Sequence, residues 1–519
     1  MKQLPLDCKI LGLWILALVP FISLCIFMCD GHLIYTLDDP YIHLSLAYRI
    51  LHGGYGVNAG EMSAPSSSIL WPLMLAPMIL TGFKMSAPLL LDLLATGLTI
   101  IVGVRLLQRE GLLQLNAHPL FRASVVAVFV LAISPFALPI TGMEHNWHVL
   151  ATVCAFSGLL LAAQGATPSF CLLAAIVAMP LFRFEGMAYA SLCLLALWLY
   201  GYRRQAVVTA IVLLILLGGY VVFMVSHDLP VIPSSVLLKS RVMSTAYGQH
   251  GSELGALWGS LKYNLSGSAG RWQLAAILAM GGITYACRSG ERRMTIFNLT
   301  VFLALLAHLL CGQYGWFYRY EIYVNTLAVL GLLAGVRQLL PRLDDKGQRI
   351  LPWVALFFCF GMTAECAVAA WVAPSGSRNI YEQQVQMRRF VQDYYQRPVG
   401  VNDLGLVSYG NSQYTLDLWG LGSEPVRKLI LQKAFTPEAM DKMVRDRDVG
   451  LVIIYQNWFK ALPENWQKVA ILHTSKVTAA EGEVTFYVTI SDARDYALQQ
   501  LKEWQPTLPA QDRLELFEP

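Results

Sequence analysis

The sequence predicts a polytopic α-helical membrane protein that ends in a soluble α/β domain. Hydrophobic residues make up 56% of the 519 residues and charged residues only 14%, whereas soluble proteins contain about 25% charged residues. Long apolar stretches recur up to residue 373, and the composition becomes polar from residue 374 onward. The formal charge of +4 is small and the basic residues are scattered, so nucleic acid is not an expected partner.

The apolar stretches predict about eleven transmembrane helices. Most approach the roughly 20 residues that a bilayer crossing requires, and two shorter ones flank a charged corner at Arg183 and Glu185. The first stretch is too long for the core of a signal peptide, and no A-x-A site follows it, so we expect it to stay uncleaved. The stretches cover approximately residues 10–29, 87–107, 123–140, 146–164, 170–182, 186–201, 205–225, 272–287, 294–311, 322–340 and 350–373.

Lysine and arginine in the short loops predict the orientation, because loops that retain positive charge stay cytoplasmic. With the N-terminus inside, basic clusters such as Arg203 with Arg204 all fall on the inner side. The C-terminal tail and the first loop then lie outside, which in a bacterium is the periplasm. The predicted location is therefore the bacterial inner membrane. The apolar segment 67–82 is short and contains two prolines, so we expect a partly inserted helix there.

The polar tail has the pattern of an α/β domain. Pro-Ser-Gly-Ser at 374–377 predicts a hinge, and the charged and amide side chains of 381–395 predict a surface helix. Short β-branched runs at 399–402 and 450–455 are typical of buried parallel strands. Residues 483–490 alternate in polarity, which predicts a further strand.

These features predict two domains. Residues 1–373 form the transmembrane domain, with a first periplasmic loop at 30–86, and residues 374–519 form the periplasmic α/β domain. Thr436 before Pro437 predicts a capped helix start within the second domain. This domain contains no cysteine, so it must fold without disulfides or thiolate metal sites.

An acidic pair, Asp38 and Asp39, stands out in the first loop. Asp39 precedes Pro40, which predicts an N-cap with proline in the first turn of a helix that extends to Leu51. Caps are common at membrane helix ends, so spacing alone favours a structural role. An aspartate at the bilayer centre costs at least about 2.5 kcal/mol, so the pair belongs at headgroup level, where a membrane-bound substrate presents its polar part.

Other outer segments bring further charges to the same surface. Each alone is consistent with interfacial anchoring, because polar and aromatic residues gather at headgroup level. Together, acids and cations on one face suit a site that cleaves a bond to a phosphate: the acids activate a nucleophile or hold a divalent ion, and the cations stabilise the departing phosphate. The residues are Glu144 and His145 in TGMEHN, Arg183 in LFRFEG, Lys239 and Arg241 in IPSSVLLKSR, and Arg319 in GWFYRYEIY.

Several motifs occur in an order that resembles a known superfamily. They are DDPYI, GYGVN and SAPSSSILW in the first loop, TGMEHN and FRFEG in later corners, and NDLGLVSY with LDLWGL in the tail. With them the chain resembles the GT-C polyprenyl-phosphate-dependent glycosyltransferases, in particular bacterial arabinofuranosyltransferase-like members with a periplasmic C-terminal domain. It departs at 233–239, where relatives usually have a Pro-Asn-Thr-like run, and at Phe184, where many have proline.

The resemblance implies a GT-C-like fold and a hexosyl- or pentosyltransferase activity. A sugar would pass from a polyprenyl-phosphate donor to an acceptor hydroxyl of a glycan, lipid or protein of the cell envelope, on the periplasmic face. Membrane lipid is the remaining expected partner. These motifs identify no cofactor with certainty, and a divalent metal ion is an open alternative.

The same resemblance assigns roles to the candidate residues. Asp38 is expected as the catalytic base, with Asp39 as its partner or as a cap. Glu144 and His145 are expected to contact the acceptor, with Glu144 as a second acid, and Asp38 with Glu144 would hold a metal if one is used. The expected ligands of the donor phosphate are Arg183 and Lys239, and Arg241 and Arg319 are added from their charge and their side of the membrane.

Two other classes of function compete with this hypothesis. A transporter or flippase of lipid-linked substrates would perform no covalent chemistry, and such proteins often contain internal repeats and paired broken helices. The sequence contains no clear repeat. A non-catalytic sensor or scaffold would display the α/β tail and use the acidic pair only as a cap.

Overall fold

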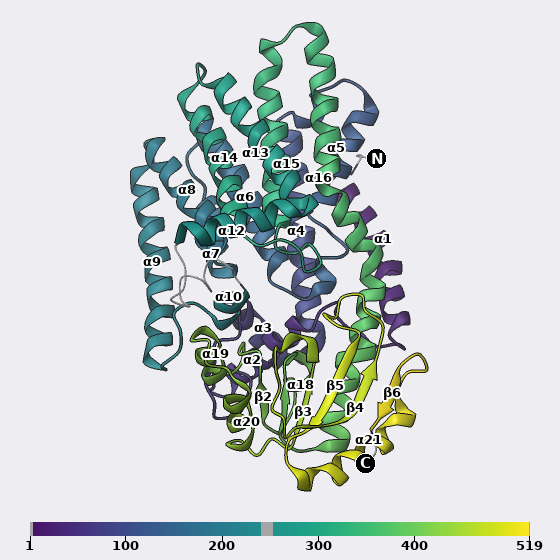
Figure 1. Cartoon of the computed structure of the whole chain (residues 1–519). Helices are drawn as coiled ribbons and strands as arrows, with labels where there is room; N and C mark the ends of the chain where they lie inside the picture. Colours follow the sequence, from purple (N-terminus) through teal and green to yellow (C-terminus); the bar gives the residue numbers. More distant parts are fainter. Residues whose placement is uncertain (1–3, 240–252, 518–519) are drawn as a thin grey trace.

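The computed structural model describes residues 4–239 and 253–517. A helical bundle forms one end of the molecule, and the C-terminal sheet with its helices forms the other (Figure 1). A helix lies at each of the eleven predicted apolar stretches. These helices are α1 (Leu6–Met28), α4 (Ala87–Arg109), α5 (Pro119–Ala132), α6 (His145–Ala163), α7 (Phe170–Phe182), α8 (Gly186–Leu199), α9 (Arg203–Ser226), α13 (Ser268–Cys287), α14 (Arg292–Cys311), α15 (Ile322–Leu339) and α16 (Asp345–Ile380).

The composition of these helices confirms the predicted fold class. Seven helices in the described part of the chain are long and apolar enough to cross a membrane, and four more apolar helices are shorter. The chain is thus a multi-pass membrane protein with a C-terminal α/β region. Helix α15 is the centre of the bundle, since every residue from Ile322 to Val336 is buried. Helices α1 and α9 lie at its edge with mostly exposed apolar side chains, as lipid-facing helices do.

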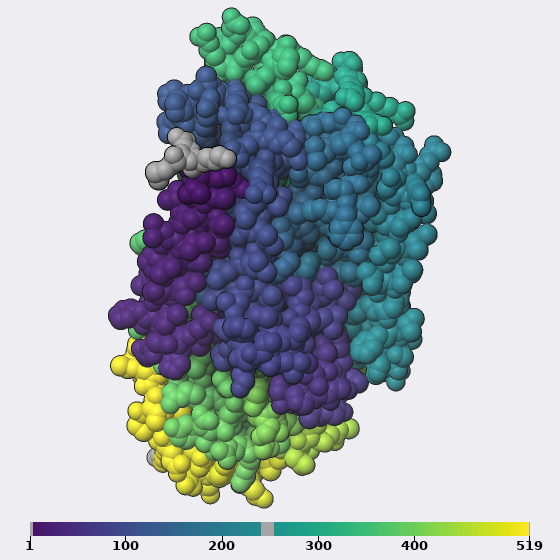
Figure 2. Space-filling view, turned by 180° about the vertical axis from the view of Figure 1, so that it is seen from behind, coloured from purple at the N-terminus to yellow at the C-terminus, as the bar shows by residue number. Residues whose placement is uncertain are grey.

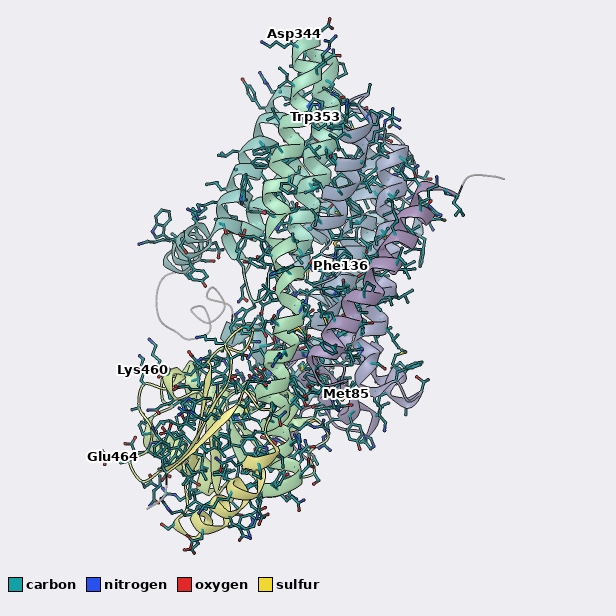
Figure 3. The ribbon with its side chains drawn as sticks, turned by 90° about the vertical axis from the view of Figure 1, so that its right-hand side faces the viewer. Met85, Phe136, Asp344, Trp353, Lys460 and Glu464 are labelled. Atoms are coloured by element: carbon teal, nitrogen blue, oxygen red, sulfur yellow. The ribbon has the colours of Figure 1, made fainter. Side chains whose placement is uncertain are left out.

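Charged residues expected on the inner side lie at one end of the bundle. Arg105 near the end of α4 pairs with Asp7 at the start of α1, with 2.7 Å between Nε and Oδ2. The turn before α16, marked by Asp344 in Figure 3, also lies at the bundle end remote from the C-terminal sheet. The basic clusters expected inside thus lie opposite the domain expected outside. Which end faces the cytoplasm stays a prediction.

Helix α16 crosses the predicted domain boundary without a break. The helical path continues after Ile380 through η5 (Tyr381–Val385), α17 (Gln386–Arg389) and η6 (Phe390–Tyr395) into the C-terminal sheet (Figure 3). The predicted hinge at 374–377 is therefore wrong. The hydroxyl of Thr478 donates to the Gly376 carbonyl at 3.2 Å, so contacts from the sheet domain hold this segment helical. The division at residue 373 stays a prediction.

The C-terminal sheet has six strands in the order β2-β1-β3-β5-β4-β6. β1 pairs in parallel with β2 and β3, as predicted for the runs at 399–402 and 450–455, and the remaining pairs are antiparallel. The predicted strand at 483–490 is confirmed as β5. The strands are β1 (Val399–Val401), β2 (Thr415–Asp417), β3 (Leu451–Ile454), β4 (Gln467–His473), β5 (Glu483–Val488) and β6 (Arg513–Leu516).

Helices cover both faces of this sheet. α19 (Glu424–Leu431) and α20 (Pro437–Arg445) pack through residues such as Val426 and Val444 on one face. η6 and α21 (Arg494–Trp504) cover the other, where Phe390 and Trp504 are fully buried. The Thr436 hydroxyl accepts a hydrogen bond from the Ala439 N–H at 3.3 Å, so the predicted capped start of α20 is confirmed.

The first loop contains two predicted helices, α2 (Asp39–Leu51) and α3 (Leu70–Leu80), and it docks on the C-terminal domain. In Figure 2 this part of the chain lies directly against the C-terminal region. Asn58 pairs with the edge strand β2: its Nδ2 donates to the Thr415 carbonyl at 2.9 Å, and its Oδ1 accepts from the Thr415 N–H at 3.0 Å. The side-chain amide thus makes the two backbone hydrogen bonds that a neighbouring strand would make with Thr415.

The acidic pair does not cap α2, so the predicted Asp39 N-cap is wrong. Asp38 occupies the N-cap position, and its side chain makes no capping hydrogen bond. Its carboxylate instead accepts the N–H groups of Gly405 at 2.5 Å and Leu406 at 2.8 Å, at the start of α18 (Gly405–Ser408). Asp38 thus binds backbone N–H groups from a distant part of the chain instead of those in the first turn of α2.

Gly405→Ala should weaken this docking. An added Cβ at residue 405 would lie 2.1 Å from the Asp38 carbonyl oxygen, so α2 or α18 must shift. Overpacking of this kind costs about 1–3 kcal/mol, and we expect a thermal unfolding midpoint lower by a few degrees. Gly259→Ala is the control, because nothing lies within 4 Å of a Cβ at that position. Equal midpoints for both variants would contradict the tight contact.

Candidate active site

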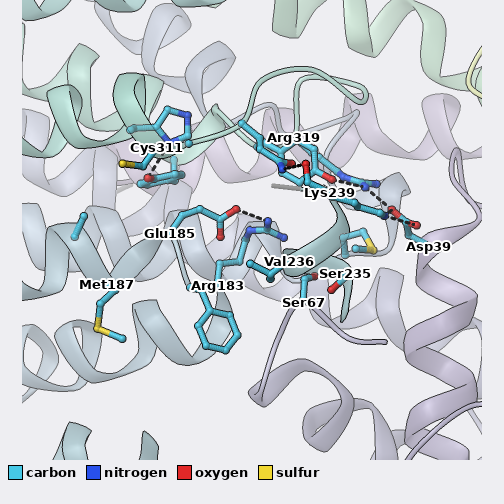
Figure 4. A pocket seen from close by; sticks show the side chains of 18 of the residues that line it. Asp39, Ser67, Arg183, Glu185, Met187, Ser235, Val236, Lys239, Cys311 and Arg319 are labelled. Carbon is cyan, nitrogen blue, oxygen red and sulfur yellow. Dashed lines mark hydrogen bonds and ion pairs between the residues drawn. The ribbon is translucent and has the colours of Figure 1, made fainter. Parts of the chain in front are cut away.

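A cavity of about 280 Å³, lined by the bundle and its loops with Leu421 of the C-terminal domain, brings four of the predicted residues together (Figure 4). Asp39 begins α2, Arg183 lies between α7 and α8, Lys239 ends α10 (Ser234–Lys239), and Arg319 precedes α15. Four separate segments thus supply one polar group each. The apolar part of the wall includes Met187 and Ala188 of α8, and Ala307 and Cys311 of α14.

Asp39 forms ion pairs with two of the cations. Its Oδ1 lies 3.2 Å from Nζ of Lys239, and its Oδ2 contacts Nη2 of Arg319. Burial opposes ionisation of Asp39, but the two cations outweigh it and hold the pKa of the carboxyl well below its usual range. The same attraction raises the pKa of Lys239 against the effect of burial. The trio therefore carries a net charge of +1.

The guanidinium of Arg319 has donors that no described residue accepts. Its side chain is only 2% exposed. Nη2 contacts Asp39 and the Tyr320 hydroxyl, whereas Nε and Nη1 have no partner among the described residues. Buried charged donors without partners are costly. An anion within hydrogen-bond distance of these two nitrogens would satisfy them.

The backbone before Arg319 is strained. Trp316, Phe317 and Tyr318 have φ angles of 45°, 66° and 58°, in the left-handed region that costs about 1–3 kcal/mol per non-glycine residue. Such strain persists where the surrounding structure imposes it, and it is concentrated at functional sites. In sequence, these aromatic residues resemble an interfacial belt. In the structure, their turn also determines where the guanidinium enters the cavity.

Arg183 is already neutralised by two acids. Nη1 lies 2.7 Å from Glu144 and Nη2 lies 2.7 Å from Glu185. Burial disfavours the charge of Glu185, but Arg183 outweighs it and lowers the pKa of Glu185 to about 2. Glu144 also accepts a hydrogen bond from the Ser67 hydroxyl at 2.9 Å. This second trio therefore carries a net charge of −1, and it is less suited to an anion than Arg319 with Lys239.

The remaining predicted residues have other positions. His145 is 2% exposed, its ring packs against Tyr320 with 5.9 Å between centroids, and both ring nitrogens lack partners within the described ranges. Arg241 lies outside the described residues. Asp38 and Glu144 have different partners, and the described residues contain no group of three metal-ligating side chains. A metal held by this pair stays a prediction.

A second cavity, of about 300 Å³, adjoins the first on the side of the C-terminal domain. Its wall includes Asp38 and, from the loop after β1, Asn402 and Asp403. Asp39 and Lys239 line both cavities, together with Gln313 and Leu421. Asp39 therefore lies where the two spaces meet.

Asp403 was not singled out from the sequence, although it lies within the motif NDLGLVSY. It follows β1, at the carboxyl end of a parallel strand, where α/β proteins commonly place their ligands. Burial, together with the proximity of other carboxylates, raises the pKa of Asp38 and of Asp403. The two acids therefore hold one proton between them over a wider pH range than isolated aspartates would.

This shared proton predicts a pH-dependent stability. A folded state with a raised pKa binds a proton that the unfolded chain releases, so its stabilisation is complete below pH 3.8 and is lost as the pH rises through the raised pKa. Asp403→Asn removes the titrating partner. We expect the unfolding midpoint of this variant, relative to wild type, to increase as the pH rises above 3.8. Parallel midpoint curves would contradict the shared proton.

Comparison with known proteins gives limited matches. A family model described as a domain of unknown function, DUF8728, matches residues 378–487. ArnT from Cupriavidus metallidurans bound to undecaprenyl phosphate is similar over 92% of this chain and 98% of that chain, with 12% identity and a TM-score of 0.46. The apo state of the same ArnT has 15% identity, a TM-score of 0.42, and coverage of 91% and 98%. No curated protein matches the chain in sequence.

Proposed function

We propose that the protein is a membrane glycosyltransferase of the GT-C type. It transfers a sugar from a polyprenyl-phosphate-linked donor to an acceptor hydroxyl of the cell envelope, on the periplasmic face of the inner membrane. The observation that carries this proposal is the buried guanidinium of Arg319. Two of its nitrogens lack partners within the described residues, and it lines a cavity that also has an apolar wall.

Arg319 and Lys239 bind the donor phosphate in this proposal. Each charge-assisted hydrogen bond contributes roughly 1.5–3 kcal/mol. Negative charge on the phosphate grows as its bond to the sugar breaks, so the same contacts strengthen in the transition state. The apolar side chains of α8 and α14 offer a surface for the first isoprene units. Arg183, held by two glutamates, positions Glu144 and Ser67 and has a smaller share in phosphate binding.

Asp39 is the base in this proposal. The acceptor oxygen forms a bond to the anomeric carbon, the bond from that carbon to the phosphate oxygen breaks, and the phosphate leaves with the electron pair. The hydroxyl proton passes to Asp39, which lies where both cavities meet. A carboxylate held by two cations is a weak base. The donor phosphate competes for Lys239 and Arg319, which makes Asp39 more basic when the donor is bound.

Asp38 has a different role in this proposal. Its carboxylate accepts two backbone N–H groups of α18, so it docks the C-terminal domain against α2. The proposed base is therefore the second member of the acidic pair, and the first is a positioning residue.

The test uses the purified full-length protein in lipid nanodiscs. A panel of polyprenyl-phosphate pentoses and hexoses is supplied with envelope acceptors, and the release of polyprenyl phosphate is followed. We expect release from at least one donor, and binding of undecaprenyl phosphate but not of the uncharged polyprenol. In liposomes, movement of a donor across the bilayer without release from any of them would establish the flippase alternative instead.

A further inference from the structure

We propose that the second cavity binds a neutral saccharide and that, given the proposed glycosyl transfer, the acceptor is a glycan. The inference starts from two indole rings. Trp419 follows β2, and Trp458 ends η7 (Gln456–Trp458), which follows β3. Both half-buried rings line the cavity, with 4.5 Å between their centroids and a tilt of 53°. Aromatic faces of this kind pack against the C–H-bearing faces of sugar rings.

The fold holds this aromatic wall in place. The Asp417 carboxylate accepts the N–H of Trp419 at 2.8 Å and the N–H of Gly422 at 2.6 Å, which fixes the turn after β2. Tyr455 packs on Trp458 with 5.4 Å between centroids. Both turns follow parallel strands that flank β1, so they lie at the edge where α/β sheets bind ligands. Hydrogen bonds and aromatic packing within the domain therefore hold the two tryptophans in place.

Two buried amides add polar groups that lack partners. Asn402 is 4% exposed and its Nδ2 has no hydrogen bond, while Gln384 is 1% exposed and its Oε1 has none within the described residues. Both side chains line the cavity. Their other amide atoms are engaged: Oδ1 of Asn402 accepts the Tyr455 N–H at 2.9 Å, and Nε2 of Gln384 donates to Asp403 at 2.8 Å. One free donor and one free acceptor match a sugar hydroxyl, which both accepts and donates.

The charge of the cavity selects the class of saccharide. Three carboxylates, Asp38, Asp39 and Asp403, line it, whereas Lys239 is its one cation among the described lining residues. Lys239 is already paired with Asp39, so the described wall offers no unpaired cation to a phosphorylated or acidic ligand. A neutral glycan needs no unpaired cation. A sugar on the tryptophans would extend toward the wall shared with the first cavity, so one of its hydroxyls would meet Asp39 beside the donor.

The experiment uses the full-length protein in nanodiscs, without donor, and measures saccharide binding by saturation-transfer NMR. The ligands are neutral oligosaccharides of three to six sugar units from glucan, mannan, galactan and arabinan. We expect at least one series to bind, and a tenfold or greater loss of affinity in Trp419→Ala and in Trp458→Ala. Trp419→Phe keeps a stacking face and should retain part of the affinity. Trp371→Ala is the matched control, because that indole is 86% exposed on α16.

The outcomes separate this inference from the proposed function. Equal affinities in all tryptophan variants, or no binding of any neutral series to wild type, would overturn the saccharide site. Transfer to a lipid or protein acceptor without saccharide binding would leave the transferase standing and overturn the glycan acceptor. Saccharide binding without release of polyprenyl phosphate from any donor would leave the saccharide site standing and overturn the transferase.

Discussion

Arg319→Met should reduce sugar transfer by about two to four orders of magnitude. The variant keeps an unbranched side chain of similar length but removes the charge and every N–H donor. If two charge-assisted bonds to the phosphate are lost, at roughly 1.5–3 kcal/mol each, the rate falls by about 10²–10⁴, since 1.4 kcal/mol is a factor of about ten. Initial rates of polyprenyl phosphate release measure the loss, and undecaprenyl phosphate affinity should fall with them.

Controls distinguish lost chemistry from lost folding. Removal of Arg319 alone leaves Asp39 with one cation, and breaking a buried pair destabilises a protein. Arg319→Lys keeps the charge without the planar fork and should retain part of the activity. Arg445→Met is the matched surface control, because that side chain is 62% exposed. Wild-type rates in Arg319→Met, at an unchanged unfolding midpoint, would rule out a role for Arg319 in phosphate binding.

The helices could be predicted from the sequence because their signal is local. A stretch such as 205–225 is apolar over the length of a bilayer crossing, and no distant contact is needed to make it a helix. The parallel strands at 399–402 and 450–455 were equally clear from their β-branched runs. The hinge at 374–377 failed for the opposite reason. Proline and glycine favour a break locally, but Thr478, about a hundred residues later, packs on this turn and keeps it helical.

The candidate site depends more strongly on distant contacts. The sequence indicated that Asp39, Arg183, Lys239 and Arg319 share a surface, and the structure places all four on one cavity. Which acid pairs with which cation could not be predicted from the sequence. Arg183 is neutralised by Glu185 in its own turn and by Glu144 at the start of α6, and the nitrogens without partners among the described residues belong to Arg319.

The different roles proposed for Asp38 and Asp39 also depend on tertiary structure. Neighbours in sequence, Asp38 and Asp39 point to partners that lie in different domains: the amides of α18 for the first, and Lys239 with Arg319 for the second. Only the docking of the C-terminal domain distinguishes them. From the sequence alone, the proline after Asp39 made it the cap and left Asp38 as the base.

Asp39→Asn should abolish transfer and, at the same time, tighten donor binding. The amide cannot accept the hydroxyl proton, and loss of general-base catalysis costs about 10²–10⁴ in rate. The same change releases Lys239 and Arg319 from their carboxylate, which turns a trio of charge +1 into a pair of charge +2. Affinity for undecaprenyl phosphate should therefore increase, and the increase should shrink at high salt because the site is partly exposed.

Asp38→Asn is the matched comparison, since it changes the neighbouring residue in the same way. Its amide still offers one acceptor oxygen to the α18 backbone, but the other atom now faces an N–H as a donor, so docking weakens. We expect a lower unfolding midpoint, unchanged affinity for undecaprenyl phosphate, and a smaller loss of transfer than in Asp39→Asn. The reverse result, with transfer abolished only in Asp38→Asn at an unchanged midpoint, would make Asp38 the base and Asp39 an electrostatic partner of the two cations.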